Sequence, residues 1–525
     1  MTQSFRQDIV NDIDYLLVNS TNEFLLEYTP LSENDCYKLT SFTGGVGDAL
    51  VCYKPTQNTK LFVDGRFHTQ ADLEVDLSKI DVVKLEIGQS QDEMICTMIE
   101  PHSTLGINTK KVSQKRLEFF ETLLKEIDVK VVPVLSDTVA KTSELATIID
   151  KSLTGLSLKE KCEKLKKPCL ITNSEELSYL CNLREFNQDY AVKIDGKVLV
   201  LEDKVILFTD YKIPETDEFE VRELNEFYEF IKTINDVIYV DKSTISAYDY
   251  SVIKNKKDAK SIINEMKSVK TKEEIEHLKY CFSMTDKALM ETRKFIEETP
   301  KVSEHDIDVE LEKNFRKFGA KSLSFKSIIA KNKNAALPHY SENSTTEIVG
   351  DGDLVLIDCG AYYEGGLATD ITRVFVKGEP TELHKKVYTT VLKMFLNAFN
   401  YQVVEGVTQG FEIDKFTREY LNNNSIDGFS FSHGLGHGIG VCVHEAPPNL
   451  SKNPVAKTPL KNSQCFTIEP GLYNENEFGI RLENSCYLEN GVIKSFSNMC
   501  YEKKLVDYSM LTDVEKEWLS NFEVL

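Results

Sequence analysis

The sequence predicts an α/β (α+β) protein with two α/β domains followed by a longer C-terminal domain. The chain has 525 residues, and single hydrophobic cores stop growing at roughly 250 to 300 residues, so several domains are expected. Its first half alternates helical stretches with short β-rich runs, and a long charged helix then opens the remaining chain. We expect domains over residues 1–150, 151–265 and 266–525.

The first two predicted domains share an alternation of helices and strands. In the first, β-rich runs cover residues 61–67 and 129–135. In the second, residues 153–183 predict a helix, a strand and another helix, and residues 197–210 predict two strands around a short turn. The second domain is therefore expected to have an architecture similar to that of the first.

The third predicted domain begins with a charged helix over residues 268–298, which Pro300 ends because proline cannot continue a helix. Farther along, apolar residues recur at every fourth position: Val387, Val391, Phe395 and Phe399. This spacing is typical of an amphipathic helix whose apolar stripe packs on a core. The isolated histidines His277, His305 and His384 are also expected to be core residues.

The composition excludes several classes of function. The formal net charge is −22 and basic residues do not cluster, so no nucleic-acid partner is expected. No run approaches the roughly 20 apolar residues that span a membrane, and residues 1–17 resemble neither a secretory signal nor a transit peptide. The 12 cysteines are scattered without CxxC pairs, which favours reduced thiols. We therefore expect a cytoplasmic protein.

Two acidic residues stand at matching places in a predicted hairpin over residues 353–376. Asp358 ends an apolar run, a glycine-containing turn follows, and Asp370 precedes a second β-branched run. Side chains at opposed positions of paired strands share a face, about 5 Å apart. Two carboxylates there repel each other unless a cation lies between them.

A second hairpin-like segment, residues 465–484, carries Glu469 and Glu483 between apolar flanks. Buried carboxylates cost on the order of several kcal/mol each unless they are paired or bind a metal. The glycine-rich stretch between the two hairpins adds three histidines: His433, His437 and His444. Four carboxylates and one imidazole suit two divalent first-row ions, with Mn²⁺ favoured and Zn²⁺ or Co²⁺ also suitable.

Simpler explanations exist for each part of this pattern. An Asp that ends a strand is usually a turn or helix-cap residue, and a glycine-rich stretch can bind phosphate. The glycines alternate singly here, however, and no GK[ST] follows them. The order Asp, Asp, His, Glu, Glu in similar β contexts favours a metal site over both explanations.

The motifs around these residues resemble the peptidases with the pita-bread fold, which include aminopeptidase P, prolidase and methionine aminopeptidase. These motifs are LIDCGA, TDITR, GLGHGIG, VHEAPP, TIEPG and FGIRLEN. The resemblance implies a pita-bread catalytic domain over residues 266–525 with one ligand set for two metals: Asp358, Asp370, His437, Glu469 and Glu483. Within this set, Asp370 and Glu483 would bridge the two ions.

One spacing departs from the family. Asp370 follows Asp358 by twelve residues, where the family usually has eleven, and the extra residue falls in the turn over residues 361–369. A bulge can absorb one residue without moving either carboxylate. Asp351 and Asp353 are rejected as alternative ligands because neither follows the apolar run.

The rest of the chain resembles the three-domain aminopeptidase P branch of this family. The segments LFVDGRF, LTGLSLKEK and NLREF carry the resemblance, as does the C-terminal SMLTDVEKEWLSNF. Methionine aminopeptidases lack the two preceding domains. The branch has a catalytic-pocket histidine where this chain has His339. Because the residues after Arg184 depart from the branch, the sequence assigns no role to Arg184.

The resemblance implies a metal-dependent aminopeptidase that removes the N-terminal residue from peptides with proline in second position. A hydroxide that bridges the metals would attack the carbonyl, and Glu469 would carry a proton to the leaving proline nitrogen. His339 and His444 would bind the tetrahedral intermediate or the substrate backbone. Arg481 would pair with a ligand carboxylate or with His444.

Two alternatives remain open. A prolidase, or Xaa-Pro dipeptidase, would accept only dipeptides, and a catalytically inactive protein of this fold would act as a binding module. The domain count argues against the first, and the complete ligand set argues against the second. A homodimer is expected from the resemblance alone.

Overall fold

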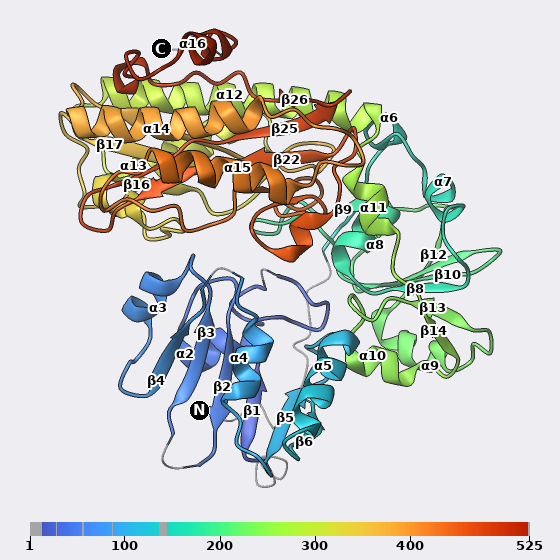
Figure 1. Cartoon of the computed structure of the whole chain (residues 1–525). Helices are drawn as coiled ribbons and strands as arrows, with labels where there is room; N and C mark the ends of the chain where they lie inside the picture. Colours follow the sequence, from blue (N-terminus) through green and yellow to red (C-terminus); the bar gives the residue numbers. More distant parts are fainter. Residues whose placement is uncertain (1–12, 28, 55–56, 87, 136–143, 523–525) are drawn as a thin grey trace. The chain divides into compact units, whose positions relative to one another are not determined.

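The computed structural model describes residues 13–27, 29–54, 57–86, 88–135 and 144–522 (Figure 1). The chain divides into two compact units. The first comprises Met1–Ile148, Leu158–Leu183 and Ile194–Ile262, and the second comprises Ile149–Ser157, Arg184–Lys193 and Ile263–Leu525. The absence of a targeting signal was predicted partly on residues 1–12, which lie outside the described residues.

In its described residues, the first unit contains two six-stranded sheets that have the same topology. Their strand orders are β4-β3-β2-β1-β5-β6 and β12-β11-β10-β8-β13-β14. In each sheet one strand, β2 or β10, runs antiparallel to both of its neighbours, and the other neighbours pair in parallel. The repeated architecture that the sequence predicts is therefore present.

Short helices accompany both sheets. The first sheet and its helices consist of β1 (Tyr15–Val18), α2 (Asp35–Thr40), β2 (Asp48–Cys52), β3 (Thr59–Val63), α3 (His68–Glu74), β4 (Ile80–Lys84), α4 (Gln91–Thr97), β5 (Thr104–Asn108), α5 (Gln114–Lys125) and β6 (Lys130–Val134). The second sheet and its helices consist of α7 (Leu158–Cys162), β8 (Cys169–Ile171), α8 (Ser174–Leu180), β10 (Lys197–Val200), β11 (Val205–Phe208), β12 (Glu220–Arg222), η1 (Leu224–Glu226), α9 (Phe227–Ile231), β13 (Ile238–Val240), α10 (Ala247–Val252) and β14 (Lys256–Asp258).

One predicted helix is broken in two. The helix expected at the start of residues 153–183 is instead α6 (Lys151–Thr154) and α7. Gly155 separates them at φ 72°, a left-handed conformation that ends the first helix. The short strands β7 (Thr147–Ile148) and β9 (Leu183–Arg184) flank this region in the sequence.

The second unit places a pair of helices before an antiparallel sheet twice along the chain. Helices α12 and α13 precede the sheet β16-β17-β19, and α14 and α15 precede the sheet β22-β25-β26. Figure 1 shows α14 lying along β22, and these two elements are in contact. The whole chain thus has the mixed α/β class that the sequence predicts, with antiparallel sheets in its last part.

The elements of the second unit have the following bounds. The helices are α11 (Ile263–Ser268), α12 (Lys272–Glu298), α13 (Glu304–Lys317), η2 (Asn332–Ala336), α14 (Glu382–Phe399), α15 (Gly410–Asn423), η3 (Pro454–Lys457), η4 (Lys503–Leu505) and α16 (Asp513–Leu519). The strands are β15 (Ser322–Leu323), β16 (Ile328–Lys331), β17 (Leu354–Cys359), β18 (Ala361–Tyr362), β19 (Ile371–Val376), β20 (Gly436–His437), β21 (Asn449–Leu450), β22 (Cys465–Ile468), β23 (Gly471–Tyr473), β24 (Gly479–Arg481), β25 (Asn484–Glu489) and β26 (Val492–Ser495).

Local signals explain the two longest helices. Thr271 caps α12 by accepting the Glu274 N–H while the Glu274 side chain accepts the Thr271 N–H. The helix then ends before Pro300, as predicted. In α14 the predicted stripe packs on the core, with Val387, Val391 and Phe395 fully buried and Phe399 partly buried.

The three histidines expected in the core have different environments. His277 is buried, and its Nε2 accepts the Gly365 N–H at 3.1 Å. His384 is partly buried, with its ring edge-on to Phe478. His305 is exposed on the first turn of α13, so the prediction for this residue is wrong.

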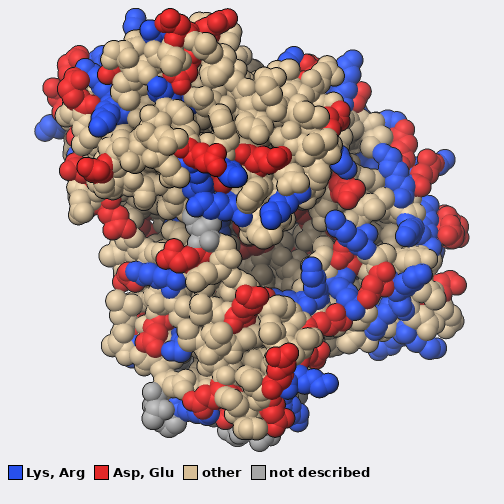
Figure 2. Space-filling model, viewed as in Figure 1, with Lys and Arg blue, Asp and Glu red and all other residues tan. Residues whose placement is uncertain are grey.

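The surface carries charges of both signs. Figure 2 shows one face, on which Lys and Arg lie among Asp and Glu in small mixed groups. Within the described ranges, no helix is long and apolar enough to cross a membrane.

Candidate metal centre

The first hairpin places its two acidic residues on one face. Strands β17 and β19 pair antiparallel as predicted, with Asp358 opposite Thr372. Asp370 immediately precedes β19, two positions before Thr372, and side chains two apart on a strand share a face. Asp358 and Asp370 are only 8% and 5% exposed, so both carboxylates are removed from bulk water.

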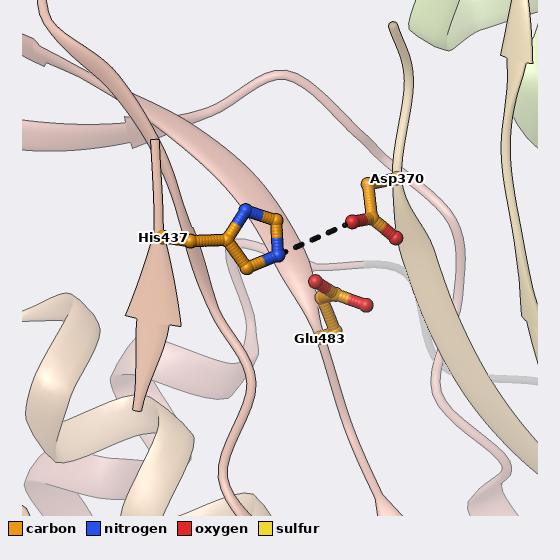
Figure 3. A group of neighbouring side chains, drawn as sticks. All are labelled: Asp370, His437 and Glu483. Carbon is orange, nitrogen blue, oxygen red and sulfur yellow. Dashed lines mark ion pairs between the residues drawn. The ribbon is translucent and has the colours of Figure 1, made fainter. Parts of the chain in front are cut away.

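Three further candidate ligands come from the later part of the second unit. His437 ends β20, Glu469 directly follows β22, and Glu483 lies between β24 and β25. Ligand atoms of Asp370, His437 and Glu483 lie within 4.8 Å of one another. Figure 3 shows these three side chains converging from separate segments. His437 Nε2 is 3.5 Å from Asp370 Oδ2 and 3.6 Å from Glu469 Oε1.

The carboxylates of this cluster disfavour one another's negative charge. Burial, followed by repulsion from Glu483 and Asp358, raises the pKa of Asp370 well above its ordinary value. Burial, followed by repulsion from Glu469 and Asp358, likewise raises the pKa of Glu483. Burial also raises the pKa of Glu469, to about 7. Carboxylates with such pKa values bind protons or cations in preference to remaining free anions.

Two buried carboxylate oxygens remain available to a cation. Among the described residues, Asp358 Oδ1 and Glu483 Oε1 have no hydrogen-bond partner. The other oxygen of each group is occupied, because Arg481 Nη2 donates to Asp358 Oδ2 at 2.6 Å and Thr372 Oγ1 donates to Glu483 Oε2 at 2.7 Å. Buried polar atoms without partners are rare. This donor set, rich in oxygen with one imidazole, therefore fits divalent cations.

Arg481 connects the two hairpins. Besides Asp358, its guanidinium donates to Thr372 Oγ1 at 3.2 Å and to the Tyr473 hydroxyl at 2.9 Å. The Arg481 side chain is 3% exposed. Arg481 thus contacts the carboxylate of Asp358, a candidate ligand, and this contact orients Asp358.

The structure adds Tyr473 and His433 to the site. His433 Nε2 lies 2.7 Å from the Tyr473 hydroxyl, and His433 Nδ1 lies 3.8 Å from Glu469 Oε2. The sequence shows His433 within the glycine-rich stretch, but His433 stands outside the ligand order and Tyr473 outside every motif used above. Only the folded chain brings these two residues together beside Glu469.

Two threonines also support the ligands. Thr467 Oγ1 accepts the His437 N–H at 3.1 Å, and Thr372 donates to Glu483 as described. Both residues lie two positions from an acidic ligand, since Thr372 follows Asp370 and Thr467 precedes Glu469. The spacing of two residues could have identified these threonines from the sequence, because it places them on the same face of the strand as the candidate ligands.

The glycine-rich stretch permits close backbone packing around His437. A Cβ on Gly436 would lie 1.9 Å from the Thr467 carbonyl oxygen, and one on Gly438 would lie 1.9 Å from the Glu445 carbonyl oxygen. Real Cβ atoms do not approach other atoms so closely. The alternating glycines are therefore explained by packing, without a phosphate.

His444 lies beside His437, a candidate ligand. Their ring centroids are 4.3 Å apart with an interplanar angle of 75°. The next residue, Glu445, is buried and accepts hydrogen bonds from Lys270 Nζ at 2.6 Å and from the Val441 N–H at 2.8 Å. Glu445 thereby fixes the loop that presents His444 to the site.

His339 lies on the turn that follows η2 and is partly buried. The helix η2 packs closely on β24, since a Cβ on Gly479 would lie 1.9 Å from the Ala335 carbonyl oxygen. Strand β24 ends at Arg481. The segment that carries His339 is thus tied to the strand that carries Arg481.

Arg184, to which the sequence assigns no role, is fully buried in the second unit. Its Nε donates to the Gly366 carbonyl at 3.0 Å. Gly366 has φ 62° and lies in the turn between Asp358 and Asp370. Arg184 therefore supports the turn that contains the extra residue.

Comparison with known proteins agrees with this geometry. Residues 276–490 match metallopeptidase family M24, and residues 137–274 match the creatinase/prolidase N-terminal domain. Together the two matches cover about two thirds of the chain. Residues 276–490 thus carry the M24 metallopeptidase domain that the motifs predict. The relatives that match almost the whole chain are named Xaa-Pro aminopeptidases, which agrees with the predicted resemblance to the aminopeptidase P branch.

Three known proteins show how similar this chain is to its relatives in sequence and fold. A probable Xaa-Pro aminopeptidase P from Laccaria bicolor is 26% identical over 98% of this chain and 87% of its own length. The structure of an X-prolyl aminopeptidase from Caenorhabditis elegans has a TM-score of 0.89 at 23% identity, over 99% of this chain and 93% of that one, which shows the same fold. The Xaa-Pro dipeptidase from Bacillus anthracis is 27% identical, with a TM-score of 0.56, over 65% of this chain and 98% of its own.

Proposed function

We propose that the protein is a metal-dependent aminopeptidase that hydrolyses the bond between an N-terminal residue and a penultimate proline. The observation that carries this proposal is the convergence of Asp370, His437 and Glu483 inside an M24 domain. Relatives that match almost the whole chain are named probable Xaa-Pro aminopeptidase P or Xaa-Pro aminopeptidase 1, which supports the same specificity here. A proline bond has no N–H, so selection must rest on a pocket for the pyrrolidine ring.

Two divalent ions would be held by the five predicted ligands: Asp358, Asp370, His437, Glu469 and Glu483. The crowding of these carboxylates and the two oxygens without partners support a dinuclear site. The Caenorhabditis elegans protein is described as having a di-nuclear active site. We propose Mn²⁺ as the ion, and Zn²⁺ or Co²⁺ suit the same donors. When bound, such ions polarise a carbonyl and lower the pKa of water.

The chain's own residues would move the proton and bind the developing charge. Glu469, whose Oε1 lies 3.6 Å from His437 Nε2, would accept a proton from the attacking water and deliver it to the proline nitrogen. His339 and His444 would donate hydrogen bonds to the oxyanion or hold the substrate backbone. Arg481 would keep Asp358 oriented through their 2.6 Å contact.

The alternatives are less well supported. The dipeptidase from Bacillus anthracis matches only 65% of this chain, whereas the aminopeptidase relatives match almost all of it. A binding protein without catalysis would have no need of an intact ligand set.

We also propose a cytoplasmic homodimer. The Caenorhabditis elegans protein is described as cytosolic, and the dimer rests on the resemblance to the aminopeptidase P branch.

Hydrolysis of an Arg-Pro-Pro peptide tests the proposed function. After chelation the protein should be inactive, and one added divalent metal should restore the release of free arginine. Asp358→Asn and Glu469→Gln should each lower kcat by about 10²- to 10⁴-fold while the circular dichroism spectrum stays unchanged. Undiminished cleavage without metal would rule out the mechanism. Cleavage of Xaa-Pro dipeptides alone would identify a prolidase.

A further inference from the structure

A buried carboxylate stands at the start of helix α13. Glu304 is the first residue of this helix, directly after the N-cap Ser303, and it is fully buried. A buried carboxylate is retained only where donors compensate its charge. The N–H groups of the first helical turn provide a favourable field for the anion, but the hydrogen-bond donors to Glu304 come from another segment.

Four donors of the described chain converge on Glu304. Its Oε1 accepts the Lys331 N–H at 2.7 Å and Asn334 Nδ2 at 2.9 Å. Its Oε2 accepts the Ser344 N–H at 2.9 Å and lies 2.8 Å from the Tyr340 hydroxyl, whose single proton it shares with the Glu342 carbonyl. All four donors belong to residues 331–344, and they stand on both sides of His339.

The same segment is held to α13 by a backbone contact. The His305 N–H donates to the Ser344 carbonyl at 3.1 Å, so Ser344 is bonded to α13 through both its N–H and its C=O. Tyr340, which follows His339, also accepts a hydrogen bond from Asn334 Nδ2 at 3.1 Å. The turn around His339 is thus closed by contacts that meet at Glu304.

The charge of Glu304 is what allows this arrangement. The carboxylate of Glu304 accepts hydrogen bonds on both oxygens. A glutamine at this position would have one oxygen and one N–H₂ group, and the N–H₂ group would face one pair of donors. If the amide nitrogen faced Ser344, two N–H groups would point at each other, and if it faced Lys331 the same conflict would arise there. Either orientation must open one side of the turn that holds His339.

We propose that Glu304 is a positioning residue that sets the place of His339 in the catalytic pocket. This inference rests on the proposed function, in which His339 binds the substrate backbone or the oxyanion. Glu304 therefore acts through His339 and makes no contact of its own with substrate.

A double-mutant cycle with Glu304→Gln and His339→Ala tests the proposal. We expect Glu304→Gln to lower kcat for the Arg-Pro-Pro peptide by about ten- to hundredfold, since displacement of a catalytic group by about 1 Å costs as much. The kcat of the double variant should be no lower than that of His339→Ala alone, because both changes remove the same contribution of His339 to catalysis. If the two losses multiply instead, Glu304 does not act through His339.

Glu515 provides a matched control. It is a buried carboxylate in the first turn of α16, where Oε1 accepts Asn397 Nδ2 at 3.0 Å and Oε2 accepts the Thr512 N–H at 2.9 Å. Glu515→Gln should lower the melting temperature, leave kcat within about twofold of wild type, and combine multiplicatively with His339→Ala. If Glu515→Gln lowers kcat as much as Glu304→Gln does, general destabilisation explains both losses.

Tyr340→Phe keeps the proposal testable if Glu304→Gln does not fold. This change removes one donor to Glu304 and leaves its charge, so we expect a loss of about two- to tenfold in kcat that disappears in the His339→Ala background. An unchanged kcat in Tyr340→Phe would overturn the proposal. A wild-type protein that does not cleave the peptide would instead contradict the proposed function, and the two failures are thus distinguished.

Discussion

Glu469 is proposed both to bind a metal and to move a proton, and both roles depend on its charge. Burial is the main cause of its raised pKa of about 7, Arg481 opposes the shift, and repulsion from Asp358 adds to it. Without cations, a bound proton therefore stabilises the folded site. With cations present, the carboxylate is held as the anion that ligation requires.

The metal-free protein should lose stability as the pH rises. Glu469 has an ordinary pKa of 4.5 and a folded pKa of about 7. The stability from its proton is thus fully present below pH 4.5 and is lost as the pH rises through 7. In urea unfolding with chelator, the part of this fall that depends on Glu469 should be at most about 3 kcal/mol, given that 17% of the side chain is exposed.

Two comparisons isolate this effect. Saturating divalent cations should flatten the pH dependence of the unfolding free energy, because ligation replaces the proton. Glu469→Gln should reduce the slope in chelator, because the amide does not titrate. The same slope in wild type and in Glu469→Gln would assign the effect to other groups and remove the argument for a perturbed Glu469.

Among the elements of the second unit, the loop from His437 to His444 depends on a buried ion cluster. Glu445 lies 2.6 Å from Lys270 and 3.8 Å from Lys267, and their side chains are 1–2% exposed. The lysine charges and the Val441 N–H lower the pKa of Glu445 against the effect of burial, which is the largest single contribution. Both lysines precede α12, so the cluster joins the start of that helix to the loop.

Breaking this cluster should be costly. Glu445→Gln leaves two buried ammonium groups without their anion, and we expect a loss of about 3 to 5 kcal/mol in the free energy of unfolding. The exposed pair Lys279–Glu276 is the control, since its partners are 40% and 59% exposed. Glu276→Gln should change stability by less than about 1 kcal/mol. Equal effects of the two variants in urea unfolding would contradict the structural role of the cluster.

The sequence predicted those features that depend on local pattern. The alternation around Asp358 and Asp370 predicted their hairpin, the four-residue spacing predicted α14, and Pro300 predicted the end of α12. The break at Gly155 was missed because a single glycine is tolerated inside many helical patterns. His305 was misplaced because one histidine carries no periodicity of its own.

Features that depend on contacts between distant segments could not be predicted from the sequence. The network of Arg481, Tyr473 and His433 joins residues whose side chains meet only after β23 and β24 pair. Glu304 and the His339 turn are likewise separated in the chain. The roles of the five ligands came from resemblance to a known family, and the boundaries at residues 150 and 265 stay predictions.

At the scale of the whole molecule, the metal centre depends on both halves of the second unit. Asp358 and Asp370 come from the sheet that follows α12 and α13, whereas Glu469 and Glu483 come from the segments after α14 and α15. Strand β19 contacts β24 and β25, so the two halves meet at the candidate ligands. Cations bound there would therefore stabilise the unit as a whole.

The most direct test of this account is the number of divalent ions that the chain binds. Chelated protein titrated with Mn²⁺ in a calorimeter, with bound metal measured independently by elemental analysis, should bind two ions per chain. Asp370→Asn, which removes a proposed bridging ligand, should bind fewer than two while its circular dichroism spectrum is unchanged. A wild-type chain that binds no more than one ion would contradict the dinuclear site on which the proposed function rests.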